Sequence, residues 1–388
     1  MTGRSATTLL GLVVLVVAVS LWAACVERSP IVLGVVISET GPAAEYGKAV
    51  RMGIDLAYAE AVEQGGFPEG RRLALSYRDD GGKPDASLAA AKNLVGVTQA
   101  NLLLGGLTSG VAQAVIPFLV EKEVVMISPS ASAPSLTAQG GGWFFRVYPN
   151  DAAETQQIGA AVRNLGLAEV AVLTYNETFG RSLSELFAAQ MTADGVKIAV
   201  QESFDAPLAA DRAKELAKKV VAAKVRAVYI AGLVNEVAAL CQALDAEKFD
   251  GVKLASSAVT SDIVKLAGPA AERLIFPQAA FELEGSAPKI KSFADAFQRK
   301  YNRAPGVYAA YGYDAMQAMV AALRKTQRGT AGEVRTQLGA LSLDGVTGKL
   351  AFDNRGDVRR VPHLTAVVKG DLHHFDKLDA ALRAALLP

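Results

Sequence analysis

The chain has 388 residues, of which 51% are hydrophobic and 20% are charged, and its formal net charge is +1. This balance excludes the basic surface that binding to nucleic acid or to an anionic membrane would require. The length is too great for one hydrophobic core and is typical of two domains.

An export signal is predicted at the N-terminus. Arg4 supplies positive charge, and an uncharged, largely apolar run of 16 residues extends from Leu9 to Ala24. The run is short for a helix that spans a bilayer, which needs about 20 apolar residues. We therefore expect residues 1–24 to be a signal peptide, and the mature chain to lie outside the cytoplasm with equal numbers of basic and acidic side chains.

Cys25 directly follows two small residues, Ala23 and Ala24. This arrangement resembles the bacterial lipobox, in which the cysteine is acylated and tethers the protein to the membrane. The alternative is ordinary secretory cleavage near Ala24, because the lipobox usually has leucine three positions before the cysteine, where this chain has Trp22. Cys241 lies in an apolar helical stretch, which predicts a buried structural thiol.

Strand and helix patterns alternate after the leader. Short apolar runs predict buried strands, and apolar residues three and four apart predict helices. Their alternation predicts a parallel sheet covered by helices on both faces. The expected elements are strand 31–37, helix 47–64, strand 73–77, helix 84–97, strand 101–104, helix 110–122 and strand 124–127.

A second series with the same alternation begins after residues 129–142, which are rich in Ser, Ala, Pro and Gly. Two similar halves predict two Rossmann-like, doubly wound α/β lobes. The segment 143–147 opens this part of the chain, and the elements expected there are helix 152–165, strand 170–174, helix 181–193, strand 197–202, helix 209–223, strand 227–231, helix 235–247 and strand 252–255. In the tail, residues 275–277 and expected helices 288–301, 307–324 and 332–341 precede expected strands 349–352 and 364–368.

Motifs of catalysis are missing from the sequence. It contains no phosphate-binding Gly-x-x-x-x-Gly-Lys-Ser/Thr loop, no Gly-x-Ser-x-Gly elbow and no His-Glu-x-x-His pair. Its three histidines are His363, His373 and His374, and the last two are expected on the surface. We therefore expect neither an enzyme nor a bound metal or cofactor.

The loop Gly105 to Gly110 joins a predicted strand to a predicted helix. Open α/β sheets bind ligands at the carboxyl ends of their strands. Backbone N–H groups at a helix N-terminus attract anions, so a carboxylate could bind beside Ser109. The alternative is that Thr108 or Ser109 only caps the helix.

Seven short motifs in order resemble the leucine/isoleucine/valine-binding family of type I periplasmic binding proteins. Members of that family have two lobes that close on a ligand, and they deliver this ligand to an ABC permease. The motifs are Thr40 to Gly47, Asp79-Asp80, Gly106 to Ser109, Ile127 to Pro134, Phe144 to Arg146, Tyr311 to Ala315 and Gly348 to Asp353.

The resemblance implies a hinge of three crossings, near Pro149, near residues 277–280 and near residues 363–365. Lobe 1 is then expected to comprise residues 30–148 and 281–363, and lobe 2 residues 149–280 and 364–388. The expected partner is an ABC permease, and the expected location is the periplasm or another extracytoplasmic space.

The resemblance also implies the ligand-binding residues. Ser109 is expected to hold a ligand carboxylate, with a backbone group at Ser130 and the hydroxyl of Ser132 beside it. The expected side walls are Tyr46 from lobe 1 and Phe179, Leu233 and Ala258 from lobe 2.

Lobe 2 departs from the family pattern, because a tyrosine near Leu233 and an acid near Ala258 are absent. An α-ammonium group removed from water needs a partner. Glu236 and Asp262 are nearby substitutes, although helix N-terminal charge is the favoured interpretation of both.

The ligand is therefore predicted to be either an aliphatic amino acid or a carboxylate without an amine. The apolar residues Phe179, Leu233 and Ala258 lean toward the second. A sensor protein of the same fold is the alternative function.

Overall fold

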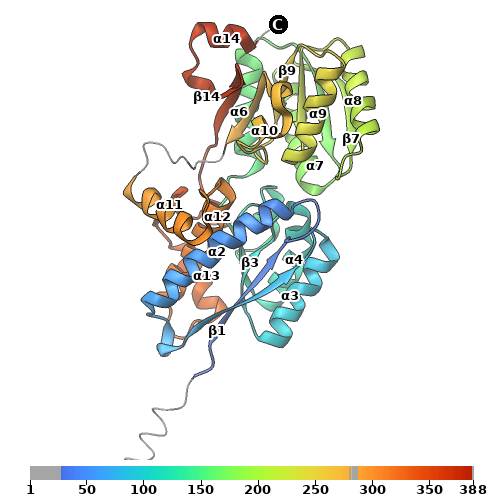
Figure 1. Ribbon diagram of the computed structural model, residues 1–388. Helices are drawn as coiled ribbons and strands as arrows, with labels where there is room; N and C mark the ends of the chain where they lie inside the picture. Colours follow the sequence, from blue (N-terminus) through green and yellow to red (C-terminus); the bar gives the residue numbers. More distant parts are fainter. Residues whose placement is uncertain (1–27, 279–280, 282–286, 387–388) are drawn as a thin grey trace, which may run out of the picture.

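The computed structural model describes residues 28–278, 281 and 287–386. The predicted signal peptide, Cys25 and residues 279–280 of the predicted second crossing lie outside this part of the chain. The described residues form two α/β lobes, one above the other in Figure 1. This confirms the predicted fold class.

Lobe 1 is built on a parallel sheet of five strands in the order β2-β1-β3-β4-β5. Helices α2 (Ala44–Gln64), α3 (Pro84–Thr98), α4 (Ser109–Lys122) and α5 (Ser135–Gln139) alternate with these strands. Strands β1, β3 and β4 are almost wholly apolar, as expected for a sheet covered on both faces, whereas the edge strand β2 is more polar and half-buried. The strands are β1 (Ile31–Ile37), β2 (Leu73–Asp79), β3 (Leu102–Gly105), β4 (Val125–Ser128) and β5 (Phe144–Arg146).

Lobe 2 is built on a sheet of seven strands in the order β14-β13-β10-β9-β8-β6-β7. Strands β6 to β10 are parallel, whereas β13 runs antiparallel to β10 and β14 antiparallel to β13. The strands are β6 (Glu169–Tyr175), β7 (Lys197–Phe204), β8 (Ala227–Ala231), β9 (Val252–Ala255), β10 (Leu274–Gln278), β13 (His363–Val368) and β14 (Asp371–His374). The helices are α6 (Asp151–Asn164), α7 (Thr178–Ala193), α8 (Ala210–Ala222), α9 (Val234–Ala246), α10 (Ile263–Ala267) and α14 (Ala380–Leu386).

The tail returns to lobe 1 between β10 and β13. Helix α12 (Val307–Arg324) packs along α2, and Gly312 permits this close approach because a Cβ there would lie 2.3 Å from the backbone oxygen of Val50. The other returning elements are α11 (Pro288–Tyr301), α13 (Ala331–Gly339) and the hairpin β11 (Leu343–Gly345) and β12 (Gly348–Leu350).

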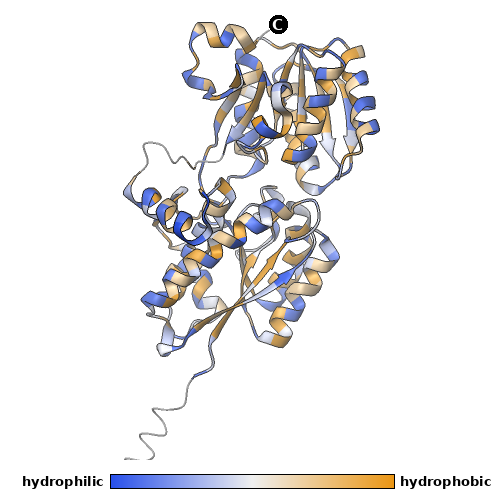
Figure 2. Cartoon of the chain, viewed as in Figure 1, coloured by the Kyte–Doolittle hydropathy of each residue, from blue (hydrophilic) through white to orange (hydrophobic). Residues whose placement is uncertain are grey.

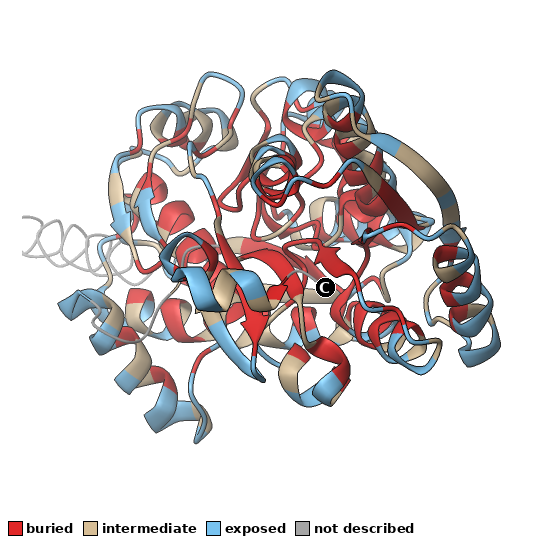
Figure 3. Cartoon of the chain, turned by 90° about the horizontal axis from the view of Figure 1, so that it is seen from above, coloured by how far each residue is buried: buried red, intermediate tan, exposed pale blue. Residues whose placement is uncertain are grey.

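Apolar residues concentrate on the strands and on the inward faces of the helices (Figure 2). Buried residues accordingly follow the sheets, while the outer helices alternate buried and exposed positions (Figure 3). Cys241 is fully buried, as predicted, and burial raises the pKa of its thiol to about 12. Among the described helices, none combines the length and apolarity needed to cross a bilayer.

Several predicted boundaries are wrong by a few residues. Helix α7 begins at Thr178 rather than Arg181, and Ser109 is the first residue of α4 rather than part of the preceding loop. The first turns of both helices begin with Ser or Thr and contain glycine, which add little to the apolar periodicity, so the pattern alone places these helix starts too late. Strand β14 was missed, and its His373 and His374 are half-buried rather than on the surface.

Arg146 fixes the loop that follows β4. Its side chain is fully buried, and its Nε donates to Asp357 Oδ1 at 2.5 Å. Its Nη1 donates to the backbone oxygens of Ala131 and Ala133 at 3.3 and 2.8 Å. One guanidinium group therefore holds the segment containing Ser132 against the tail of the chain.

We predict that Arg146→Ala lowers the free energy of unfolding by about 3–5 kcal/mol, because it leaves a mostly buried carboxylate and two carbonyls without their partner. Urea unfolding measures this. The control is Arg163→Ala, which removes a surface pair with Asp194 and is expected to cost less than about 1 kcal/mol. Equal effects of the two changes would contradict the role of Arg146.

Candidate ligand-binding site

A small cavity lies between the two lobes, and we call it the inner cavity. Its volume is about 40 Å³, far below the roughly 300–1,000 Å³ of typical small-molecule sites. All seven residues predicted from the family resemblance line it. The lining is Tyr46, Leu107, Thr108, Ser109, Ser130, Ser132, Tyr175, Glu177, Phe179, Leu233, Ala258 and Tyr308.

The lining residues reach the cavity because almost all of them follow the carboxyl end of a parallel strand. In lobe 1 they follow β1, β3 and β4, and in lobe 2 they follow β6, β8 and β9. Tyr308 is the exception, because it lies in the first turn of α12. The carboxyl ends of the parallel strands of both sheets, where open α/β sheets bind their ligands, therefore face the same space.

The hydroxyl groups of Ser109 and Ser130 form hydrogen bonds with backbone groups of lobe 1. Ser109 is buried, and its Oγ accepts hydrogen bonds from the backbone N–H groups of Ser132 and Ala133 at 3.3 and 3.2 Å. Ser130 Oγ donates to the backbone oxygen of Leu107 at 2.6 Å. Neither Ser109 nor Thr108 caps α4 through its side chain, so the alternative capping role is not observed.

The N-terminus of α4 contacts a carboxylate from lobe 2. The backbone N–H of Gly110 donates to Glu177 Oε1 at 2.6 Å, and Thr108 Oγ1 donates to the same oxygen at 3.4 Å. Glu177 Oε2 accepts from the backbone N–H of Phe179 at 2.8 Å, which caps α7. Burial raises the pKa of Glu177, and these hydrogen bonds oppose the rise. Glu177 was not among the residues predicted from the sequence, although it is an acid two residues before Phe179 at the start of a predicted loop-to-helix junction.

Tyr46 connects the lobes through its hydroxyl. It accepts from the backbone N–H of Val234 at 2.8 Å and donates to the backbone oxygen of Ala258 at 3.1 Å. Burial raises the pKa of Tyr46, so the phenol keeps its proton and can donate. Its ring meets that of Tyr308 edge to face at 4.6 Å, and the two rings wall the inner cavity.

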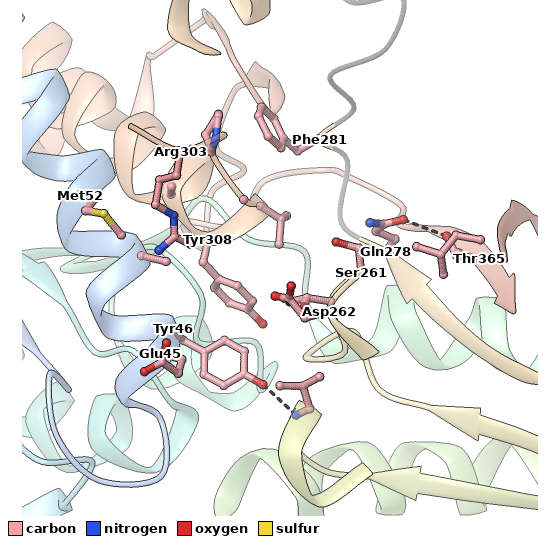
Figure 4. A pocket seen from close by; sticks show the side chains of 18 of the residues that line it. Glu45, Tyr46, Met52, Ser261, Asp262, Gln278, Phe281, Arg303, Tyr308 and Thr365 are labelled. Atoms are coloured by element: carbon pink, nitrogen blue, oxygen red, sulfur yellow. Dashed lines mark hydrogen bonds between the residues drawn. The ribbon is translucent and has the colours of Figure 1, made fainter. Parts of the chain in front are cut away.

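Tyr46 and Tyr308 also line a larger cleft of about 580 Å³, which we call the outer cleft (Figure 4). These two residues therefore line both the outer cleft and the inner cavity. Arg303, Glu45 and Asp262 supply charge to the outer cleft. A ligand in the inner cavity requires the lobes to separate or these rings to move.

Neither acid considered from sequence lies in the lining of the inner cavity. Glu236 is buried in the first turn of α9, and Asp262 lies in the outer cleft just before α10. Both positions agree with the favoured interpretation of helix N-terminal charge.

Comparison with known proteins identifies the family. A family model described as periplasmic binding protein matches residues 30–371. The chain belongs to the periplasmic binding protein family. This confirms the predicted resemblance and its non-enzymatic, solute-binding character.

Two relatives match most of this periplasmic binding protein. The leucine-, isoleucine-, valine-, threonine- and alanine-binding protein of Pseudomonas aeruginosa is 28% identical over 325 residues, which cover 82% of this chain and 85% of the relative. A Leu/Ile/Val-binding protein of Rhizobium johnstonii is 28% identical over 347 residues, which cover 87% and 92%.

Two solved structures share the fold. A branched-chain amino acid transporter substrate binding protein from Streptococcus pneumoniae, in complex with isoleucine, superposes with a TM-score of 0.80 at 23% identity and covers 89% of this chain and 98% of its own. An ABC transporter solute binding protein from R. palustris, in complex with benzoate, gives 0.78 at 20% identity and covers 89% and 95%.

Two buried acids lie where the periplasmic binding protein passes from lobe 1 to lobe 2. Glu154 accepts hydrogen bonds from the N–H and the hydroxyl of Ser257 at 2.9 and 2.5 Å. Burial, reinforced by the neighbouring Asp151, raises the pKa of Glu154 to about 8, and burial raises that of Asp151 to about 6. Glu154 therefore keeps its proton at neutral pH in the folded state.

We predict that Tyr46→Phe shifts the ligand-free protein toward an open arrangement, because it leaves Val234 N–H and Ala258 C=O without a partner in the closed one. The penalty for the closed arrangement is about 1–3 kcal/mol. Small-angle X-ray scattering should show a larger radius of gyration. The control Tyr58→Phe removes a hydroxyl bonded within lobe 1, to Leu73 O, and should leave the radius unchanged. An unchanged radius in Tyr46→Phe would contradict the inter-lobe role.

We predict that Glu154→Gln flattens the pH dependence of stability. Between the ordinary pKa of 4.5 and about 8, folded Glu154 holds a proton that the unfolded chain releases, so the free energy of unfolding falls as pH rises through this window. In Glu154→Gln, the free energy of unfolding should therefore fall less steeply with pH than in wild type, by up to about 1.4 kcal/mol per pH unit. Urea unfolding across this pH range checks it, with the exposed Glu63→Gln as control. Parallel slopes for wild type and Glu154→Gln would exclude a raised pKa.

Proposed function

We propose that the inner cavity captures a small organic carboxylate between the two lobes and that the protein delivers it to an ABC permease. The observation that supports this most strongly is the convergence of the predicted residues of both lobes on one inter-lobe cavity. Lobe 1 offers Ser109, Ser130, Ser132 and the N-terminus of α4, all of which suit a carboxylate. Lobe 2 offers Phe179, Leu233 and Ala258 as an apolar wall.

The names of the similar proteins support the same class of ligand. The P. aeruginosa relative is named for aliphatic amino acids and threonine, and the two solved structures hold isoleucine and benzoate. All of these ligands carry a carboxylate. The inter-lobe position supports capture by closure, because a ligand that contacts both lobes stabilises the closed arrangement.

We propose the lobe limits expected from the sequence, residues 30–148 with 281–363 and residues 149–280 with 364–388. The packing of α12 on α2 and of α13 on β4 supports the return of the tail to lobe 1. We also propose that residues 1–24 are a signal peptide and that acylated Cys25 tethers the mature protein outside the cytoplasmic membrane.

We predict that Ser109→Ala weakens carboxylate binding about 10- to 100-fold, which corresponds to the roughly 1.5–3 kcal/mol of a hydrogen bond to a charged group. The measurement is isothermal titration calorimetry of the mature chain, with Cys25→Ser, against amino acids and amine-free acids. Exposed Ser135 in the same lobe provides the control Ser135→Ala, which should bind as wild type. Unchanged affinity in Ser109→Ala would remove Ser109 from the site.

A further inference from the structure

The charges around the inner cavity are unbalanced. Among the described residues that line it, Glu177 is the only acid, and no lysine, arginine or histidine occurs. Arg181 is the nearby cation that lowers the pKa of Glu177, but it is exposed, and its Nη1 donates to Asn176 Oδ1 at 2.9 Å. The cavity therefore contains one carboxylate whose partners are N–H and hydroxyl groups.

The position of Glu177 conflicts with a ligand carboxylate. Its Oε1 lies 2.6 Å from the backbone nitrogen of Gly110, the residue next to Ser109. A ligand carboxylate bound by Ser109 and the N-terminus of α4 would lie against Glu177. Two carboxylates at one site disfavour each other when both are ionised. An amine-free acid therefore has to displace Glu177 or bind beside an uncompensated like charge.

Displacement of Glu177 has its own energetic consequence. A buried charge that loses its partners is strongly destabilising, and the lining offers no cation to replace them. An α-amino acid resolves both problems, because it brings an ammonium group next to its carboxylate. Glu177 Oε2 can remain on the N–H of Phe179 while Oε1 turns from Gly110 to the ammonium group.

We propose that Glu177 determines specificity by accepting the ligand ammonium group, so that the protein prefers α-amino acids to amine-free acids. This inference rests on the proposed function, because it assumes that a ligand carboxylate binds at Ser109. It reverses the lean toward amine-free acids that the apolar residues of lobe 2 suggest in the sequence. The acid that is absent near Ala258 is supplied from the loop after β6 instead.

The test compares matched ligand pairs by isothermal titration calorimetry on the mature chain with Cys25→Ser. The pairs are leucine with isocaproate, valine with isovalerate and phenylalanine with hydrocinnamate, and benzoate is added as an aromatic acid. We expect wild type to bind at least one amino acid roughly 30-fold or more tightly than its amine-free partner. In Glu177→Gln the amino acid should weaken by a similar factor while the amine-free partner does not, so the preference collapses.

Two further variants support the interpretation. Glu185→Gln makes the same change at an exposed position of α7 and should preserve the preference. Glu177→Asp keeps the charge on a shorter side chain. It should still bind the amino acid more tightly than its amine-free partner, although with lower affinity than wild type. Circular dichroism and thermal unfolding establish whether each variant is folded. If Glu177→Gln does not fold, Glu177→Asp is compared with wild type instead.

Three outcomes would overturn the inference in distinguishable ways. If Glu177→Gln tightens both members of a pair equally, Glu177 is only a competitor for the carboxylate site. If wild type binds benzoate or another amine-free acid as tightly as any amino acid, Glu177 is not the ammonium partner, while the proposed function stands. If wild type binds no carboxylate of either kind, the proposed function fails and this inference fails with it.

Discussion

The carboxyl ends of two parallel sheets open onto one space, and the rest of the molecule follows from this constraint. Loops after β1, β3 and β4 meet loops after β6, β8 and β9 around the inner cavity. Such loops are free to vary because the strands beneath them are buried and regular. The tail completes the arrangement by returning α12 to lobe 1, which brings Tyr308 to the same cavity.

Polar contacts across the cavity set the balance between open and closed arrangements. The Tyr46 hydroxyl forms hydrogen bonds with two backbone groups of lobe 2, and the Glu177 carboxylate accepts a hydrogen bond from the N-terminus of α4 in lobe 1. Each contact satisfies groups that a ligand or water would otherwise satisfy. If the ligand binds in the inner cavity as proposed, it replaces these hydrogen bonds between the lobes with its own, and its affinity then depends on how well its groups match the ones that it replaces.

Regular structure was largely predictable because buried parallel strands are continuous apolar runs and their helices have clear periodicity. The candidate residues Ser109, Ser130 and Ser132 came from the family resemblance, and only Ser109 was also indicated by its position between a predicted strand and a predicted helix. Glu177 was not predictable, because its role depends on Gly110, which lies 67 residues earlier in the chain. Tyr308 was not, because it reaches the cavity through the packing of α12 on α2, which no local pattern contains.

The crystal structure of the mature protein with a bound amino acid tests the account most directly. We expect the ligand carboxylate within hydrogen-bond distance of Ser109 and the N-terminus of α4. We also expect the ligand ammonium group on Glu177, with the contact between Glu177 and Gly110 broken. A ligand in the outer cleft beside Arg303, with Glu177 still bound to Gly110, would contradict it.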